Sequence, residues 1–288
     1  MNQKKWLVSI LICTYNASET IFATIQSCLN QTYSNIEILI HDDQSVDKTL
    51  EIIKNIWDEK IKIIYSWQKL WPYWWLNFLL DHACGEYIAI QDHDDLRHPE
   101  KIEKQINFLK NNKEYIWCGT KTLMRYEWDQ KGFEYFLWEK NYYTIHPSLV
   151  FRNGSYRYPT DTSYMVDAYF QKMKLCKWWE KLIYNTDETL TLHLVKAGAK
   201  NYSYKWFRYS LVTMRTIFTL HPLWYGVLII GRETMRKIVY PLLQYIDKGS
   251  WIDKIERIPF SLLGNKIENY PRKKIIELGF YDDLIRDL

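Results

Sequence analysis

The sequence contains few cysteines and glycines, and it has no long apolar run. Its five cysteines are odd in number and form no CxxC pair, so neither a disulfide framework nor a cysteine-based zinc site is expected. No stretch approaches the roughly 18 apolar residues that a membrane-spanning helix requires. Residues 1–30 lack the basic and apolar regions of a signal peptide. We therefore expect a cytoplasmic protein in a reducing compartment.

Aromatic residues and one basic segment stand out against this background. The chain has 14 Trp and 23 Tyr against 10 Gly, which predicts a core and contact surfaces rich in rings. The segment after residue 204 contains 14 Lys and Arg against 9 Asp and Glu, so it holds all of the net charge of +4. A basic segment of this kind indicates contact with phosphate groups.

The basic segment also has the pattern of an amphipathic helix. Its apolar stripe lies opposite three basic side chains, and the two sets are Met235, Ile238, Val239, Leu242 and Ile246, and Arg232, Arg236 and Lys237. Such a helix suits the surface of an anionic membrane, on its inner face. The equally weighted alternative is a helix packed on the rest of the chain or on a second subunit, which would make a homo-oligomer.

The first hundred residues alternate between strand and helix patterns. Apolar runs predict strands over residues 7–13, 36–41, 61–65 and 87–90, with helices capped by Ser18 and Ser45 and a further helix opening at Pro99. This order predicts a parallel sheet covered by helices. Ligands bind beyond the carboxyl ends of such strands. Polar clusters follow three of them, at residues 14–16, 42–43 and 92–95.

The cluster after residue 91 contains three carboxylates within four residues. Asp92 and Asp94 are expected to point the same way along an extended backbone, and with Asp95 they would repel one another without a cation. Hard oxygen ligands suit Mg²⁺ or Mn²⁺ held jointly with a diphosphate. The alternative is an acidic loop that caps the helix after Pro99, with its carboxylates in solvent.

Three segments in this order carry a resemblance to a known family: Val8-Ser-Ile-Leu-Ile-Cys-Thr-Tyr-Asn16, Asp42-Asp43-Gln-Ser-Val-Asp47-Lys-Thr49 and Asp92-His-Asp94-Asp95. Together with residues 146–152 and 166–170, they resemble family 2 of the inverting nucleotide-sugar glycosyltransferases over about residues 6–200. The resemblance implies an α/β, GT-A fold, in which a Rossmann-like, mostly parallel sheet carries helices on both faces. We expect this domain over residues 1–204 and a basic, mainly helical extension over residues 205–288.

The resemblance also assigns the nucleotide and metal sites. It places Thr14, Tyr15, Asn16 and Asp43 at the nucleoside, with Asp43 accepting a hydrogen bond from the base. A base edge with N–H donors favours a fixed carboxylate at that place. Asp92 is placed near the ribose and the metal, and Asp94 is placed as a ligand of Mn²⁺ or Mg²⁺ on the diphosphate, whose growing charge needs neutralising.

The sugar site follows from later segments. By the resemblance, His146 lies beside the sugar, Asp167 occupies the position of the catalytic base, and His193 is a candidate for contact with the diphosphate. A deprotonated Asp167 would take the proton of the acceptor hydroxyl as that oxygen attacks the anomeric carbon. Alternatively, Asp167 is an ordinary surface carboxylate and His146 is a packed histidine.

Two departures from the family pattern bear on activity. Val166 stands where the family usually has a glutamate immediately before the base. A Trp-rich segment, residues 66–76, stands where the family usually has a pliant loop with Asn and Gly. One alternative is therefore an inactive sugar-binding, nucleotide-binding or scaffolding module of the same fold. A nucleotidyltransferase would need a Gly-rich basic loop after the first strand, where residues 13–19 supply neither.

The resemblance thus implies an inverting, metal-dependent hexosyltransferase of cell-envelope polysaccharide biosynthesis. It would move a sugar from a nucleotide-diphosphate donor, UDP above other nucleotides, to a glycan or lipid-linked acceptor. Nucleic acid is not expected as a partner, because no recognition motif occurs and the basic excess is confined to the last 84 residues.

Overall fold

The computed structural model describes most of the first two thirds of the chain. The described residues are 3–70, 73–126, 129–135, 144–160, 166–171, 182–195, 227, 230 and 267–270. The domain boundary expected at residue 204 and almost all of the expected helical extension lie outside them. They remain predictions.

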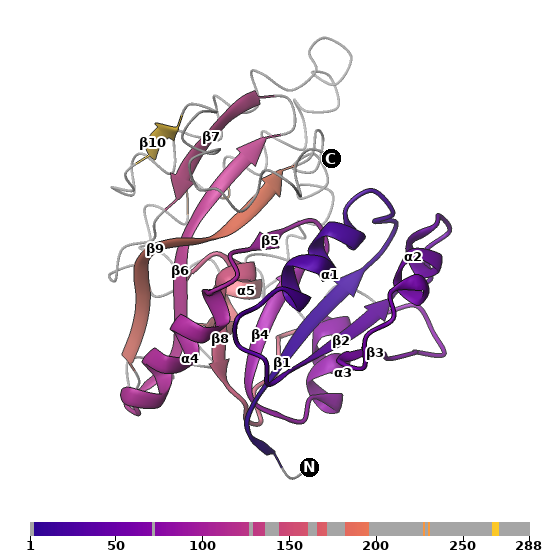
Figure 1. Ribbon diagram of the computed structural model, residues 1–288, viewed down its shortest axis with the longest axis horizontal. Coiled ribbons are helices and arrows are strands. Elements are labelled where there is room, and N and C mark those ends of the chain that lie inside the picture. The colour runs from indigo at the N-terminus through magenta and orange to yellow at the C-terminus, as the bar shows by residue number, and fades with distance from the viewer. Residues whose placement is uncertain are drawn as a thin grey trace.

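The described elements alternate between strands and helices up to Asn111 and are mainly strands thereafter (Figure 1). In chain order they are β1 (Lys4–Thr14), α1 (Ile21–Leu29), β2 (Ile36–Asp42), α2 (Thr49–Asn55), β3 (Ile61–Ile63), α3 (Trp74–His82), β4 (Gly85–Asp92), β5 (Leu96–Arg97), α4 (Lys101–Asn111), β6 (Tyr115–Tyr126), β7 (Asp129–Tyr135), the 3₁₀ turn η2 (His146–Ser148), β8 (Val150–Arg152), α5 (Val166–Tyr169), β9 (Leu182–Val195) and β10 (Ile267–Tyr270).

The strands form a single mixed sheet with a parallel half and an antiparallel half. The strand order is β10-β7-β6-β8-β4-β1-β2-β3, and the last four of these strands run parallel. Strand β8 joins them antiparallel to β4, and β6, β7 and β10 continue antiparallel from there. Strand β9 lies parallel to β6 and also pairs with the short β5. In Figure 1, β6, β7 and β9 extend away from the parallel half.

Two apolar layers cover opposite faces of the parallel half. On β1, Ile10 and Ile12 belong to the layer that includes Ile25 of α1 and Ile106 of α4. Leu11 points to the other layer, whose members include Leu79 of α3 and Phe170 beside α5. Successive side chains of a strand face opposite sides, so a continuous apolar run is fully buried here. Helices on both faces of the sheet are therefore confirmed.

The two serines predicted as helix caps have other partners. The residues before α1 and α2 are Thr20 and Lys48, and neither makes a side-chain capping bond. Ser45 instead bonds the Asp42 carboxylate through its own N–H and hydroxyl, and its hydroxyl oxygen accepts the Asn16 N–H at 2.9 Å. The cap prediction was wrong because Ser45 joins the two loops that follow β1 and β2.

The helices in the described ranges are short. None of them is long and apolar enough to cross a bilayer.

Candidate functional site

The loops after β1 and β2 are held together by backbone and side-chain bonds. The Asp43 N–H donates to the Thr14 carbonyl at 2.9 Å, and the Asn16 side-chain oxygen accepts the Val46 N–H at 3.0 Å. Tyr15 is 37% exposed at this edge of the sheet, with the Lys69 ammonium 4.0 Å from the centre of its ring. The four residues assigned to the nucleoside are thus brought together, as the strand order predicts.

Asp43 is a buried carboxylate with one oxygen in use and one free. It is 1% exposed, and its Oδ1 accepts the Leu70 N–H at 2.7 Å, with the His41 imidazole 3.8 Å away. Its Oδ2 and the Thr14 hydroxyl are buried without a hydrogen-bond partner in the described structure. Burial raises the pKa of Asp43 above its ordinary value. Buried oxygens of this kind favour a ligand that brings its own N–H donor.

The acidic turn after β4 rests on a buried network beneath it. Gln91 donates to the Asp92 and Asp95 carbonyls at 3.0 and 2.7 Å. The Thr24 hydroxyl of α1 lies 2.9 Å from the His93 carbonyl and 3.1 Å from that of Asp95. Arg97, fully buried, donates to the Gln91 side-chain oxygen at 2.7 Å. The backbone of the turn is therefore fixed from inside, which leaves its carboxylates free to face other groups.

Strand β9 brings a histidine against this turn. Leu96 of β5 pairs with Leu192, so the next residue, His193, lies beside Asp95. The His193 Nδ1 is 2.8 Å from both carboxylate oxygens of Asp95, and the Leu194 N–H donates to the same carboxylate at 2.9 Å. Burial disfavours the charged imidazole, but the Asp95 carboxylate raises the pKa of His193 to about 9.

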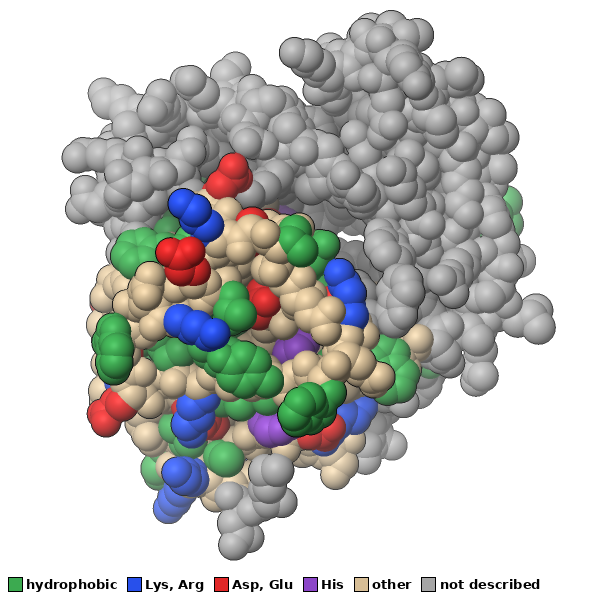
Figure 2. Space-filling model, turned by 90° about the vertical axis from the view of Figure 1, so that its right-hand side faces the viewer, with side chains coloured by type: hydrophobic (Ala, Val, Ile, Leu, Met, Phe, Trp, Pro, Cys, Tyr) green, Lys and Arg blue, Asp and Glu red, His purple; other side chains and the backbone are tan. Residues whose placement is uncertain are grey.

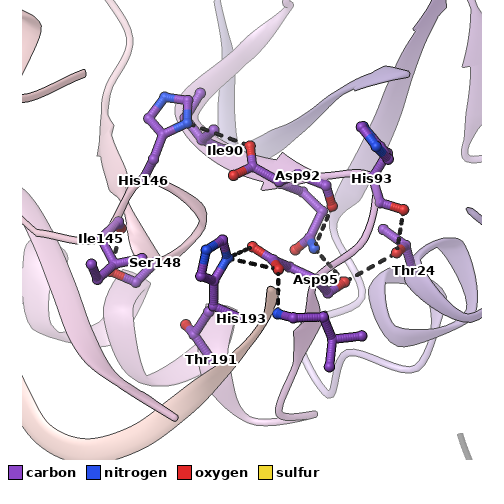
Figure 3. Close-up of polar contacts among 12 residues, drawn as sticks. Thr24, Ile90, Asp92, His93, Asp95, Ile145, His146, Ser148, Thr191 and His193 are labelled. Carbon is purple, nitrogen blue, oxygen red and sulfur yellow. Dashed lines mark hydrogen bonds and ion pairs between the residues drawn. The ribbon is translucent and has the colours of Figure 1, made fainter. Parts of the chain in front are cut away.

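A second histidine contacts the first carboxylate of the turn. His146 of η2 places Nδ1 3.4 Å from Asp92 Oδ1, and its Nε2 lies 3.0 Å from the Tyr158 hydroxyl. Although burial works against ionisation of Asp92, His146 holds the pKa of that carboxyl below its usual value. Figure 3 shows His146 and His193 reaching the acidic turn from different elements.

Asp167 lies at the start of α5, near the same group. Burial opposes the charged form of His146, but the Asp92 carboxylate and, to a lesser degree, that of Asp167 raise the pKa of this histidine. Burial and then the charge of Asp167 raise the pKa values of Tyr73 and Tyr158. The side chain of Asp167 is half-buried. The position assigned to the base is therefore near enough to His146 to act on its charge, although the two residues are more than twenty positions apart in the sequence.

The donor atoms of Asp92, Asp95 and His193 fit a divalent cation. Within the described residues, one ligand atom from each lies within 4.8 Å of the others. Carboxylate oxygens combined with an imidazole nitrogen suit Mn²⁺ better than Mg²⁺, which prefers oxygen ligands alone. The resemblance implies that Asp94, which lies between Asp92 and Asp95 in the sequence, is a metal ligand. Its side chain is half-buried, and its role as a ligand stays a prediction.

Sequence reasoning missed three parts of the site. It treated His193 as a weak candidate for diphosphate contact and did not pair it with Asp95. It assigned nothing to Tyr158, whose hydroxyl bonds His146, or to Gln91 and Arg97 beneath the turn. The positions of Gln91 and Arg97 on either side of the acidic cluster could have indicated a supporting polar pair. No pattern in the sequence around Tyr158 indicates its contact with His146.

Comparison with known proteins supports the family resemblance seen in the sequence. A sequence model of Glycosyl transferase family 2 matches residues 9–171, which is more than half of the chain. The Escherichia coli enzyme WfaP, a UDP-Glc:alpha-D-GlcNAc-diphosphoundecaprenol beta-1,3-glucosyltransferase, is 44% identical over 110 residues, 38% of this chain and 44% of WfaP. The matched segments span less than half the length of the first curated relatives.

Solved structures share the fold at low sequence identity. TarS 1–349 of S. aureus in complex with UDP-GlcNAc superposes with a TM-score of 0.57 at 17% identity, covering 80% of this chain and 72% of TarS. The mannosyltransferase PcManGT of Pyrobaculum calidifontis, with GDP-Man and Mn²⁺, has a TM-score of 0.53 at 15% identity, covering 69% of this chain and 59% of its own. These neighbours confirm the GT-A fold. With the family match over β1 to α5, they lead to one conclusion: the chain belongs to glycosyl transferase family 2.

Proposed function

We propose that this protein is an inverting, metal-dependent glycosyltransferase that moves a hexose from a UDP-sugar to a lipid-linked or glycan acceptor. The observation that supports this most is that Asp43 and Asp92 lie at the carboxyl ends of parallel strands, with His146 and His193 at the acidic turn and with the Asp167 carboxylate near enough to raise the pKa of His146. A donor, a cation and a proton acceptor each have a candidate partner there.

The nucleotide half of the donor is proposed to lie on the loops after β1 and β2. The free Oδ2 of Asp43 would accept an N–H of the base, which removes an unpartnered buried oxygen. Tyr15 and Lys69, already in contact, would flank the nucleoside and its phosphates. The choice of UDP is supported by the UDP-glucose donor in the name of WfaP and by the UDP-GlcNAc bound to TarS.

The cation is proposed to be held by Asp92, Asp94 and the Nε2 atom of His193. Both oxygens of Asp95 already accept hydrogen bonds, so Asp95 is assigned to orienting the imidazole. A bound Mn²⁺ supplies charge neutralisation for the departing diphosphate. The buried network of Gln91, Thr24 and Arg97 keeps these carboxylates in place.

Asp167 is proposed as the general base. It would take the proton from the acceptor hydroxyl while that oxygen forms a bond to the anomeric carbon and the bond to the nucleoside diphosphate breaks. Direct displacement by a single step inverts the anomeric centre. Val166, which stands in place of the family's glutamate, is buried in the apolar core. The carboxylate in the first turn of α5 is therefore that of Asp167.

Donor binding is tested by thermal unfolding. With UDP at about 100 times its Kd and Mn²⁺ present, we expect the melting temperature to rise by about 5 °C, because the ligand binds the native state only. Chelation by EDTA should remove most of this shift. ADP with Mn²⁺ is the matched control, and an equal shift from UDP with and without Mn²⁺ would contradict the metal-dependent part.

A second candidate, an inactive binding module, is favoured by Val166. It would bind UDP-sugars without releasing UDP, either by hydrolysis or by transfer to a diphosphoundecaprenol-linked sugar. Coupled measurement of UDP release on a panel of UDP-sugars therefore separates it from the enzyme.

We also propose peripheral membrane association. Two features support it: the basic extension and an exposed edge of the sheet. Strand β3 is the last strand of the parallel half, and Trp57, Tyr65 and Trp67 on its flanks are 95%, 63% and 104% exposed. Exposed Lys54 lies near Trp57 in the sequence, and Lys62, whose ammonium pairs with Glu37 at 2.7 Å, lies near Tyr65. Figure 2 shows the side of the molecule that lies on the right in Figure 1, where hydrophobic side chains lie among Lys, Arg, Asp and Glu. Exposed Trp and Tyr beside basic residues suit the headgroup region of a bilayer.

Vesicle sedimentation tests this association. The full chain should bind vesicles that contain anionic lipid, and binding should weaken as salt rises, because each nearby basic residue contributes about 1 kcal/mol that salt screens. Changing Arg232, Arg236 and Lys237 to Glu should weaken it strongly, and Trp57→Ser with Trp67→Ser more moderately. If the unchanged chain stays in the supernatant at low salt, the proposal is wrong.

A further inference from the structure

Tyr73 has a backbone conformation that aromatic residues rarely adopt. It lies within the Trp-rich segment, immediately before α3, and its φ is 71°. Only glycine enters this left-handed region freely, and the family pattern has Gly and Asn in this part of the chain. Strained conformations persist where the surroundings force them, and they cluster at ligand sites. The left-handed backbone at Tyr73 is therefore a reason to look for a ligand contact of its side chain.

The ring of Tyr73 belongs to a row of three aromatic rings. It stacks on Tyr158 with the centroids 5.7 Å apart and the planes at 28°. Tyr158 in turn stacks on Phe170, next to α5, at 3.8 Å and 15°. Tyr158 is 2% exposed and Phe170 is fully buried, whereas Tyr73 is half-buried. Within the described residues, the row therefore ends in the partly exposed ring of Tyr73.

The middle ring of this row, Tyr158, is held by hydrogen bonds from two elements. Asn77 of α3 donates to the Tyr158 carbonyl at 2.9 Å and accepts the Tyr158 N–H at 2.7 Å. The Tyr158 hydroxyl bonds His146 of η2, which contacts Asp92. The position of Tyr73 is therefore tied to the histidine and carboxylate of the site.

The phenol of Tyr73 lies near the groups assigned to the reaction. Burial raises its pKa well above the ordinary value, and the carboxylates of Asp167 and Asp92 add to this. The phenol can donate a hydrogen bond. Tyr73 stacks on Tyr158, whose hydroxyl bonds His146 beside Asp92, so Tyr73 lies close to the carboxylate assigned to the donor and therefore to where the transferred sugar would be.

We propose that Tyr73 is a specificity-determining residue, whose ring packs on the apolar face of the transferred hexopyranose and whose hydroxyl bonds one of the sugar hydroxyls. This inference rests on the proposed glycosyl transfer. Sugar rings present C–H groups on one face, and an aromatic ring with a polar tip suits such a face. The Trp-rich segment would then supply an aromatic contact to the sugar from the place where the family pattern has Gly and Asn.

The test compares binding of a nucleotide with that of its sugar conjugate. Calorimetry on the full chain with Mn²⁺ would use UDP against UDP-glucose, and GDP against GDP-mannose. Tyr73→Ala should weaken the nucleotide-sugar about 10-fold, as expected for a lost apolar contact, while the affinity for the nucleotide alone changes less than about twofold. Tyr73→Phe should have an intermediate effect. Tyr73→Gly should show the same sugar-specific loss while relieving the backbone.

The neighbouring Trp74, which is 51% exposed, provides the matched control as Trp74→Ala. It should leave both affinities unchanged. Equal weakening of UDP and UDP-glucose by Tyr73→Ala would show that Tyr73 only shapes the segment, because Leu70 of that segment bonds Asp43. Unchanged affinity for the nucleotide-sugar would also overturn the inference. If the unchanged protein binds neither pair, the proposed function fails together with it.

Discussion

Replacing Asp167 by asparagine is expected to lower turnover by about 100-fold or more, because asparagine keeps the size of the side chain but cannot accept the proton. The expected affinity for the UDP-sugar is nearly unchanged, since the residues assigned to the nucleotide lie on the loops after β1 and β2. Single-turnover transfer and donor binding, measured separately, would show this split. Asp167 is half-buried at the start of α5, so the substitution should leave the fold intact.

Asp187→Asn is the matched control, because Asp187 is an exposed carboxylate on β9. It should transfer sugar at the rate of the unchanged protein. Near-full activity of Asp167→Asn would return Asp167 to an ordinary surface role and leave the base unassigned. A loss of donor affinity equal to the loss of turnover would instead indicate damage to the site around His146.

Removing the imidazole of His193 is expected to abolish the metal-dependent part of donor binding. His193→Ala should eliminate the extra stabilisation by UDP that Mn²⁺ provides and reduce transfer by a factor on the order of 100. Asp94→Asn should do the same if Asp94 is a ligand. Asp95→Asn should weaken Mn²⁺ binding by about 10- to 100-fold, because its proposed task is to orient the imidazole.

Titration with Mn²⁺ followed by calorimetry ranks these three variants. Weak binding in Asp95→Asn with unchanged binding in Asp94→Asn would show that the cation is held by Asp92, Asp95 and His193 themselves. Tight Mn²⁺ binding in His193→Ala would contradict the assignment of the histidine. Circular dichroism controls for folding, since Asp95 is fully buried and breaking a buried ion pair is costly.

The parts of the fold that the sequence predicted are those encoded by adjacent residues. The runs at residues 7–13 and 87–90 are almost wholly apolar, a pattern that predicts strands covered on both faces, whereas residues 36–41 carry Glu37 and His41 on one face. The polar residues that follow them, Thr14, Asp43 and Asp92, meet because parallel strands end at one edge. The family resemblance added the order of the motifs and is confirmed by the family match.

The antiparallel half and the histidine contacts depend on pairings that no local pattern specifies. His193 reaches Asp95 because β9 pairs with β5 and lies parallel to β6, a connection across 98 residues. The Tyr73–Tyr158 stack likewise joins segments that are far apart in the chain. The prediction of Ser45 as a helix cap was wrong for a related reason, because its partners lie outside the helix. Ser45 bonds Asp42 and the Asn16 N–H, which belongs to the loop after β1.

The late position of β9 in the chain also governs when the site can first exist during synthesis. A ribosome adding about 5–20 residues per second needs roughly 5–20 s to go from Asp95 to His193, which are 98 residues apart. Until then Asp95 has no imidazole or Leu194 N–H to bond, and a buried carboxylate without partners is unfavourable. The nascent chain therefore leaves this turn open to water, and the emergence of residues 182–195 closes it.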